Sequence, residues 1–314
     1  MFRTKDRILL AKEESTYGSD PTPTVGSNAV ETIGIGVNYA GDVLERNLQK
    51  GTLSPDIPKL GQRWIEVDFT CEVKWSGTKG TAGRLADLIE ACGFDEVASA
   101  GSSVTYTPAS GTMKSVTIYV YDLQDSGLAR LHKIVGARGN LSMELEAGQI
   151  AKFIFKFFGL YTAPSDVSAP STPTFDSTTP PIVESSSLTL NAVSSLIAQK
   201  VGVDMNNDVV KQDDINSSAG LKGFIITGRK PSGTLNPEKV TQTVYNYATD
   251  WLAQTARELS VVVGSADGNK LTVSAPKLSI DKLGEADRNG IGVDDLPFRL
   301  TRSSGNDEIQ LKFE

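Results

Sequence analysis

The chain of 314 residues carries a formal net charge of −7 at pH 7, and 39% of its residues are hydrophobic. This length suits one large domain or two of ordinary size, and no run of about 18 apolar residues is present that could cross a membrane as a helix. The acidic balance argues against a protein that grips nucleic acid, because phosphate contacts depend on lysine and arginine.

Residues 1–18, MFRTKDRILLAKEESTYG, carry charges throughout and lack the apolar core of a secretory signal. We therefore expect the protein to stay in the compartment where it is made. Residues 36–47 (GVNYAGDVLERN) are typical of a β-strand and are echoed by residues 202–213 (GVDMNNDVVKQD). Gly, Val, Asp and Val recur at the same offsets in the two stretches.

Residues 48–63 (LQKGTLSPDIPKLGQR) form a predicted loop between two strands. The loop is too apolar for an idle surface segment, so we expect it to be a partner surface. The apolar side chains that would make the contact are Leu48, Leu53, Ile57 and Leu60.

Residues 64–75 (WIEVDFTCEVKW) alternate strictly between apolar and polar side chains, which predicts an antiparallel strand with one buried face. The buried face would carry Ile65, Val67, Phe69, Cys71 and Val73, and the outer face Glu66, Asp68, Thr70, Glu72 and Lys74.

A helix is predicted within residues 81–94, where apolar side chains fall at helical spacing and Gly93 is placed to end the helix in a left-handed conformation. Its apolar face would consist of Leu85, Leu88, Ile89 and Cys92. Both cysteines, Cys71 and Cys92, lie among apolar residues, so we expect buried free thiols. Two thiols and the single histidine, His132, are too few for a zinc site.

Residues 115–123 and 140–161 are predicted to be strands of the same alternating kind, and Ala147-Gly148 supplies a turn or bulge. In the second stretch the apolar Leu141, Met143 and Leu145 oppose Ser142, Glu144 and Glu146. The following segment, residues 162–187, is rich in Pro, Ser and Thr and is predicted to be an extended linker. It separates two parts that are each long enough for a core of their own.

The second part follows a similar order. A strand at residues 221–230 leads into a predicted helix that Asn236 opens with Pro237 behind it, and its apolar stripe is Val240, Val244, Tyr247 and Trp251. A hairpin at residues 258–276 turns at Asp267-Gly268, and a last alternating strand covers residues 308–314.

The two parts share a second short match, Ser-Gly-Thr at residues 76–78 and again at 232–234. The matched order of strands and helix favours duplication of one structural unit, and two unrelated β-rich domains are the alternative. The first match is spaced by 166 residues and the second by 156, which assigns ten extra residues to the loop at 48–63.

Catalytic and metal-binding patterns are weak. His132 has no nucleophile elbow near it, so a cross-strand or surface role is expected. Asp204, Asn206 and Asp208 alternate as in a calcium loop, but the sixth position is not Gly and the twelfth is Ile215. The paired carboxylates are outward residues of alternating strands. We expect no catalytic, cofactor or metal site, and a β-sandwich hydrolase is the weakest reading.

Several phrases resemble the major tail tube proteins of long-tailed bacteriophages. They are LLAKEESTYGSDPTP (9–23), LIEACGF (88–94), VTYTP (104–108), GARGNLSMELEAGQIAKFIFKFFGLYTAPSD (136–166) and TGRKPSGTL (227–235). The resemblance covers most of residues 1–166 and becomes thin beyond them.

The resemblance implies a mainly β chain of two tandem tube-like β-sandwich domains, each with one flanking helix. Copies would form rings around a continuous inner β-barrel, and the rings would stack. The implied divisions are an N-terminal arm and first strand (1–30), a first domain (31–162), a linker (163–187) and a second domain (188–314). The family further implies that an arm at about 12–30 and the loop at 48–63 contact the neighbouring ring.

A chain with two such domains needs only three copies for a pseudo-sixfold ring. The implied partners are further copies of the chain and the tail terminator, distal tail and tape-measure proteins, while DNA passes through without specific binding. The implied location is the virion tail, assembled in the host cytoplasm. The carboxylates expected to face the channel are Glu66, Asp68, Glu72, Glu144 and Glu146. The alternative is a receptor- or glycan-binding β-sandwich module of the tail tip.

Overall fold

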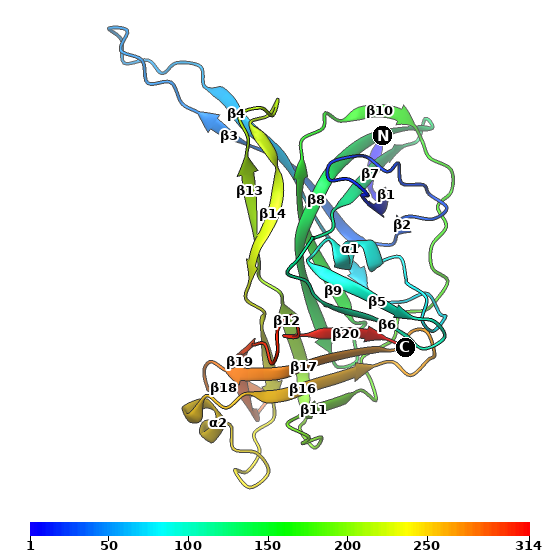
Figure 1. Ribbon diagram of the computed structural model, residues 1–314, viewed down its shortest axis with the longest axis vertical. Coiled ribbons are helices and arrows are strands. Elements are labelled where there is room, and N and C mark those ends of the chain that lie inside the picture. The colour runs from blue at the N-terminus through cyan, green and yellow to red at the C-terminus, as the bar shows by residue number, and fades with distance from the viewer.

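The computed structural model describes residues 1–314 and is built almost entirely from β-strands, with two short helices, α1 (Ala86–Glu90) and α2 (Tyr247–Ala253). This confirms the prediction of a mainly β chain. The molecule is elongated (Figure 1). A long hairpin projects from one end, and α2 lies at the opposite end.

One sheet contains the N-terminal strand and is ordered β2-β1-β7-β8-β10. Its strands are β1 (Phe2–Glu13), β2 (Ala29–Val30), β7 (Val116–Gln124), β8 (Leu128–Glu146) and β10 (Ser165–Ser168).

A second, longer sheet has the order β3-β4-β9-β8-β12-β15-β19. We call it the long sheet. Strand β8 belongs to both sheets. The remaining strands of the long sheet are β3 (Ile33–Leu44), β4 (Lys59–Glu72), β9 (Lys152–Leu160), β12 (Ala198–Asp204), β15 (Ser232–Pro237) and β19 (Ile291–Leu300).

Further strands pair in the order β5-β6-β20-β17-β16-β11, and two hairpins complete the fold. These strands are β5 (Phe94–Ser99), β6 (Ser103–Pro108), β11 (Ser187–Leu190), β16 (Arg257–Val263), β17 (Leu271–Ile280) and β20 (Gln310–Phe313). One hairpin is β13 (Asn207–Asp213) with β14 (Leu221–Arg229), and the other is β18 (Gly284–Arg288) with β19.

The alternation predicted for β4 is confirmed, since Ile65, Val67, Phe69, Cys71 and Val73 are all buried. Val67, Phe69 and Cys71 lie beside phenylalanines of β9 in the sheet, and the rings of Phe69 and Phe157 stack with centroids 6.0 Å apart. Strand β7 differs from the prediction because Val116–Val120 is buried on both faces. The residues that follow β1 cover its second face, where Thr117 donates to Glu14 at 2.6 Å.

One hydrophobic cluster of 52 buried residues runs from Leu9 in β1 to Phe313 in β20. Residues before and after the predicted linker therefore contribute to the same core. Backbone pairing also joins the two parts, because β12 pairs with β8 and β20 pairs with β6. Cys71 and Cys92 are buried free thiols, as predicted, and burial raises the pKa of both.

The first helix is shorter than predicted, but Leu85, Leu88, Ile89 and Cys92 are buried and Gly93 has a φ of +84°. The helix predicted to begin at Asn236 is wrong. Asn236 lies in β15, where its side chain accepts a hydrogen bond from the Lys200 amide at 2.7 Å. The helix begins ten residues later, because Asn246 caps it by accepting from the Thr249 amide at 3.0 Å.

The two echoed stretches occupy comparable hairpins, although the second is broken into β12–β13 and β14–β15. Gly36 lies opposite Asp68, and Gly202 lies opposite Thr234, so both pairs are 32 residues apart. The prediction that the first loop is ten residues longer than its counterpart is therefore wrong. The two Ser-Gly-Thr tripeptides are not equivalent positions, because residues 76–78 follow β4 whereas residues 232–234 lie inside β15.

Candidate functional site

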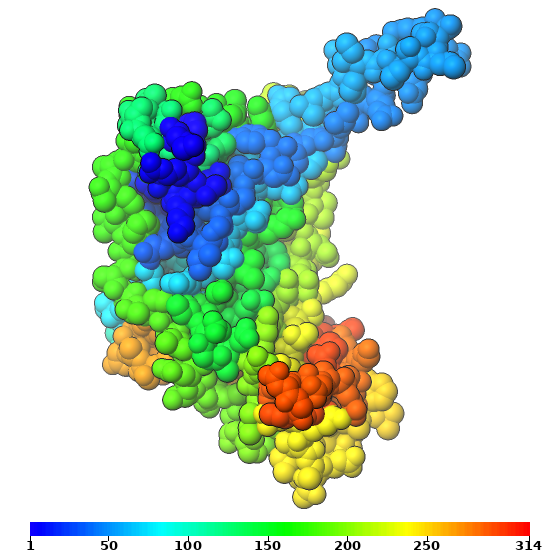
Figure 2. Space-filling view, turned by 180° about the vertical axis from the view of Figure 1, so that it is seen from behind, coloured from blue at the N-terminus to red at the C-terminus, as the bar shows by residue number.

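The β3–β4 hairpin projects from the body of the molecule (Figures 1 and 2), and it carries exposed apolar side chains. Leu53 is fully exposed and Ile57 is 83% exposed, and Leu48 and Leu60 are about half exposed. Val43 and Leu44 extend this apolar surface toward the body. We call residues 43–60 the hairpin tip. Exposed apolar surface of this kind marks an interaction site.

The base of this hairpin is fastened to the β13–β14 hairpin. Gln62 Nε2 donates to Asp213 Oδ1 at 2.8 Å and to the Gly220 carbonyl at 3.0 Å. Lys211 Nζ lies 2.9 Å from an Asp42 carboxylate oxygen and 4.3 Å from the Trp64 ring centroid. The tip is thus presented from a fixed base.

The turn between β13 and β14 adds an apolar residue that our sequence reasoning missed as a contact candidate. Ile215 is 98% exposed. In the sequence, Ile215 was considered only as the twelfth position of the calcium-loop-like stretch, where a glutamate would be needed. The usable signal was an isolated isoleucine between Asp213-Asp214 and the turn residues Asn216 and Ser217, where a buried strand would not place it.

The five carboxylates expected to face a channel all lie on the outer face of the long sheet, Glu66, Asp68 and Glu72 on β4 and Glu144 and Glu146 on β8. Lysines of the neighbouring strands lie between them. Lys156 is opposite Asp68, Lys152 is opposite both Glu72 and Glu144, and Lys200 is opposite Glu146. Lys200 Nζ also lies 3.0 Å from a Glu144 oxygen.

This outer face is therefore mixed in charge. On β4, β8, β9 and β12 it carries six carboxylates, the five already named and Asp204, and four cations, Arg138, Lys152, Lys156 and Lys200. The lysines come from β9 and β12, whose contribution the sequence reasoning omitted although their outward positions follow the same alternation. The carboxylates still outnumber the cations, so the face retains a net negative charge.

Part of the outer face is covered by the chain itself. Arg138 NH1 donates to the Phe224 carbonyl of β14 at 2.9 Å, and the Phe158 and Phe224 rings lie 5.7 Å apart. Together with Lys211 on Trp64, these contacts lay the β13–β14 hairpin beside Glu66. Of the five carboxylates, only Asp68 is exposed, and the other four are partly buried.

The segment expected to be an arm, about residues 12–30, lies against its own chain. Glu14 is buried and accepts four hydrogen bonds, from the amides of Gly18 and Gly136 and from the hydroxyls of Ser115 and Thr117, at 2.6–2.7 Å. Tyr17 donates to the Gly136 carbonyl at 3.0 Å and accepts from the Phe224 amide at 2.7 Å. These contacts tie β1 to β8 and β14.

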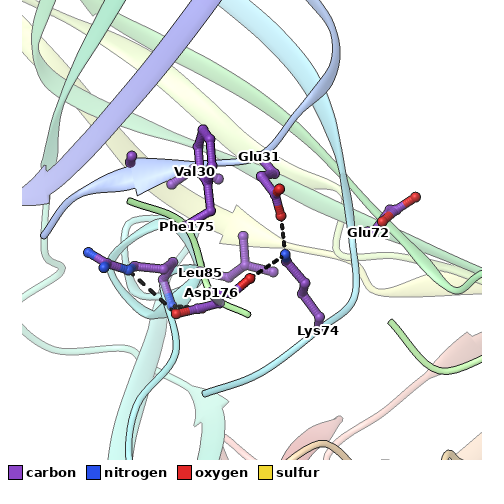
Figure 3. A pocket seen from close by; sticks show the side chains of 9 residues that line it. Val30, Glu31, Glu72, Lys74, Leu85, Phe175 and Asp176 are labelled. Atoms are coloured by element: carbon purple, nitrogen blue, oxygen red, sulfur yellow. Dashed lines mark hydrogen bonds and ion pairs between the residues drawn. The ribbon is translucent and has the colours of Figure 1, made fainter. Parts of the chain in front are cut away.

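The predicted linker is also held on the surface, as Figure 3 shows. Asp176 lies beside Arg84, with Oδ1 3.5 Å from Nε, and its carbonyl accepts from Lys74 Nζ at 2.8 Å. Phe175 and Asp176 line a cavity of about 20 Å³ with Val30 and Leu85. A cavity of this size holds about one water molecule, so it is a packing gap and not a ligand site.

His132 bridges strands, as expected. Its Nδ1 pairs with the Tyr39 hydroxyl at 2.7 Å and its Nε2 with an Asp122 oxygen at 3.1 Å. Arg7 Nε lies 2.7 Å from the other Asp122 oxygen. Asp122, His132 and Tyr39 are linked in the order of an acid–base–nucleophile triad. The hydroxyl in this arrangement belongs to a tyrosine of β3 and not to a serine.

An acidic cluster consists of Glu13, Asp87 and Glu90, with carboxylate oxygens within 4.8 Å of one another. Its charge is met by Lys114 Nζ, which lies 3.1 Å from Glu13 and 2.7 Å from Glu90. Burial raises the pKa of Glu90 to about 7, while Lys114 opposes the shift. Lys114 thus pairs with two of the three carboxylates, and Asp87 accepts a hydrogen bond from the Glu13 amide at 2.9 Å, so the cluster is explained without a metal ion.

Neither helix is long and apolar enough to cross a membrane. A family model described as "Phage tail tube protein" matches residues 4–305. No curated protein matches the chain.

Proposed function

Because that model covers nearly the whole chain, the chain belongs to the phage tail tube protein family, and we propose that it is the major subunit of a tail tube built from stacked rings. Membership makes it a structural component of the virion tail that polymerises and associates with other tail components. The finer picture is our proposal. Residues 31–162 and 188–314 act as two tube-like units, three copies close a pseudo-sixfold ring, and DNA leaves through the channel.

The observation that carries this proposal is the hairpin tip. Four large apolar side chains are exposed on a narrow projection whose base is fixed. Such exposed apolar surface favours contact with another molecule. We propose that Leu48, Leu53, Ile57 and Leu60 contact the next ring.

A second supporting observation is the edge of the long sheet. Strand β3 pairs with β4 on one side only, so its other edge leaves backbone N–H and C=O groups without a strand partner. Free edges favour pairing with another chain. In our proposal, lateral contact between copies satisfies this edge and extends the long sheet around the ring.

Electron microscopy of the purified chain, with and without a nucleating tail-tip complex, tests the proposal. We expect tubes or rings with threefold symmetry. A variant that replaces Leu53 and Ile57 with Asp should form rings but no tubes, whereas a control with Asp at the exposed Leu128 should polymerise normally. A persistent monomer that binds glycans under both conditions would overturn the proposal in favour of a receptor-binding module.

We further propose that the outer face of the long sheet lines the channel and that its excess of carboxylates prevents tight binding of DNA. Replacing Asp68 and Glu144 with Lys should make assembled tubes retain double-stranded DNA at low salt. Wild-type tubes, and tubes with Asp166→Lys on the exposed strand β10, should not. Equal retention by all three tubes would remove this face from the channel.

A further inference from the structure

Exposed apolar side chains gather at two opposite ends of the molecule. Of 22 large apolar residues that are exposed, six lie on the hairpin tip and five lie on or beside α2 and the β18–β19 turn. Figure 2 shows these regions as the projecting blue hairpin and an adjoining yellow and orange lobe at the far end. The five at the far end are Ile197, Val244, Trp251, Leu252 and Ile291.

The segments that carry the far-end residues are joined by hydrogen bonds, and we call their exposed side the α2 surface. Trp251 Nε1 donates to the Asp281 carbonyl at 3.1 Å, which joins α2 to the strand end that precedes β18. The Lys239 amide donates to the Gly292 carbonyl at 3.0 Å, and the Glu238 amide donates to the Ile197 carbonyl at 2.7 Å. Leu252 is 81% exposed on this surface and has no cover within the chain.

The two ends differ in charge. The hairpin tip holds Arg46, Lys50 and Lys59 against Glu45 and Asp56, and Lys50 is paired with Asp56. Arg46 and Lys59 are exposed and have no carboxylate partner within the chain. Glu45 is exposed and unpaired as well, so the tip carries a net charge of +1, with two unpaired cations and one unpaired carboxylate beside its leucines.

The α2 surface is acidic. Residues 238–257 and 281–295 contain seven carboxylates and four cations, a net charge of −3. Three of the four cations, Lys239, Arg257 and Arg288, are each paired with a carboxylate, and the fourth, Lys282, is exposed and unpaired. Asp281 pairs with Arg299, which lies outside these ranges. Asp287 and Asp295 are exposed and have no cationic partner. Burial raises the pKa of Asp294, and the nearby Glu285 adds to the shift.

We propose that the hairpin tip of one copy docks on the α2 surface of a second copy in the neighbouring ring. This inference rests on the proposed function and names the surface that receives the tip. An open polymer needs two different surfaces that fit each other on every copy. The tip and the α2 surface are apolar, opposite in charge and located at opposite ends, which is what such a contact needs.

Cysteine cross-linking between copies tests the contact. Chains carrying Leu53→Cys are mixed with chains carrying Leu252→Cys under conditions that form tubes, and a short bifunctional maleimide is added. The native Cys71 and Cys92 are buried, so they should not react. We expect a covalent dimer that needs both substitutions. Leu128→Cys in place of Leu252→Cys is the control and should give at least about ten-fold less dimer.

A second variant measures the energetic contribution. Leu252→Asp should raise the concentration needed for polymerisation about ten-fold or more, the effect expected for loss of one buried leucine in each contact. Its far-UV circular dichroism should match the wild type, because Leu252 is exposed. Tubes that form without the cross-link, or that tolerate Leu252→Asp, overturn this docking and leave the tube function standing. Absence of tubes and rings from the wild type overturns both.

Discussion

At the scale of single residues, two buried polar side chains determine how the N-terminal segment is held. Glu14 gathers two amides and two hydroxyls at 2.6–2.7 Å, and Tyr17 joins Gly136 to Phe224. Neither residue stood out in the sequence, because a single Glu or Tyr has no periodic pattern. All of their partners except Gly18 lie more than 100 residues away. These contacts hold the segment expected to be an arm against the body of its own chain.

Glu14→Ala should lower the free energy of unfolding by about 3 kcal/mol, because it leaves buried amides and hydroxyls without an acceptor. Glu45→Ala, at an exposed position of the hairpin tip, should change it by less than about 0.5 kcal/mol. Chemical denaturation of both variants checks the prediction. Equal stability of the two variants would contradict the role assigned to Glu14.

Glu90 should make stability depend on pH. Burial raises its folded-state pKa to about 7, above the ordinary value of a glutamate, while Lys114 opposes the shift and Glu13 and Glu96 add to it. A raised pKa means that the folded state prefers the protonated form. The stabilisation is complete below the unfolded pKa and is lost as pH rises through about 7.

The variant Glu90→Gln keeps the neutral form at every pH. Between pH 6 and pH 8 its melting temperature should therefore fall less than that of the wild type. Asp166→Asn, on the exposed strand β10, serves as the control and should follow the wild type. A parallel decline of all three proteins would show that Glu90 stays ionised in the folded protein.

At the scale of elements, the sequence predicted strands well where burial on one face alone sets the pattern. The alternation in β4 and the turn at Asp267-Gly268 are both confirmed, and each depends only on neighbouring residues. The prediction of a helix at Asn236-Pro237 was wrong because the same pair of residues can end a strand. The Asn236 side chain accepts a hydrogen bond from the Lys200 amide of β12 and does not cap a helix. That competition comes from a distant segment and leaves no local signal.

The placement of the β13–β14 hairpin was not predictable either. Its position depends on Tyr17, Arg138 and Asn207, whose Nδ2 donates to the carbonyls of Cys92 and Gly139 at 2.7 and 3.0 Å. The candidate contact residues of the tip could be picked out from the sequence, because apolar residues in a Gly- and Pro-rich loop can be recognised without knowing the fold. The lysine rows between the carboxylates became visible only with strand order.

Tyr17→Phe should loosen this hairpin. The change removes the acceptor of the Phe224 amide, so that amide should exchange with deuterium about ten-fold faster, in line with the loss of one buried hydrogen bond. Tyr161→Phe, whose hydroxyl has no hydrogen bond within the chain, should leave the exchange unchanged. Unaltered protection of Phe224 in Tyr17→Phe would show that β13–β14 is held by other contacts.

At the scale of the whole molecule, the shared core predicts cooperative unfolding. The cluster of 52 residues and the β8–β12 and β6–β20 pairings leave no surface along which the two parts separate without breaking a sheet. The composition favoured two parts, each long enough to hold a core of its own, because a Pro-rich linker is the ordinary sign of a boundary. Pairing across that boundary is a long-range property that composition does not reveal.

A single unfolding transition is therefore expected. In the variant Trp251→Phe, fluorescence reports Trp64 and Trp75, which lie where the first part contacts Lys211 and Phe313 of the second, whereas far-UV circular dichroism reports strands of both parts. The two denaturation curves should have the same midpoint. Midpoints that differ clearly would show that the two parts unfold independently despite the pairing.

Strand β8 has a mechanical consequence for any assembly of this chain. Its 19 residues pair in turn with β10, β7, β9 and β12, so one uninterrupted backbone runs through both major sheets. A tensile or bending load that enters at one sheet reaches the other through covalent bonds. Each copy should thus behave as a stiff body. Under the proposed stacking, the flexibility of a filament made from it would then reside in the contacts between copies and not within each copy.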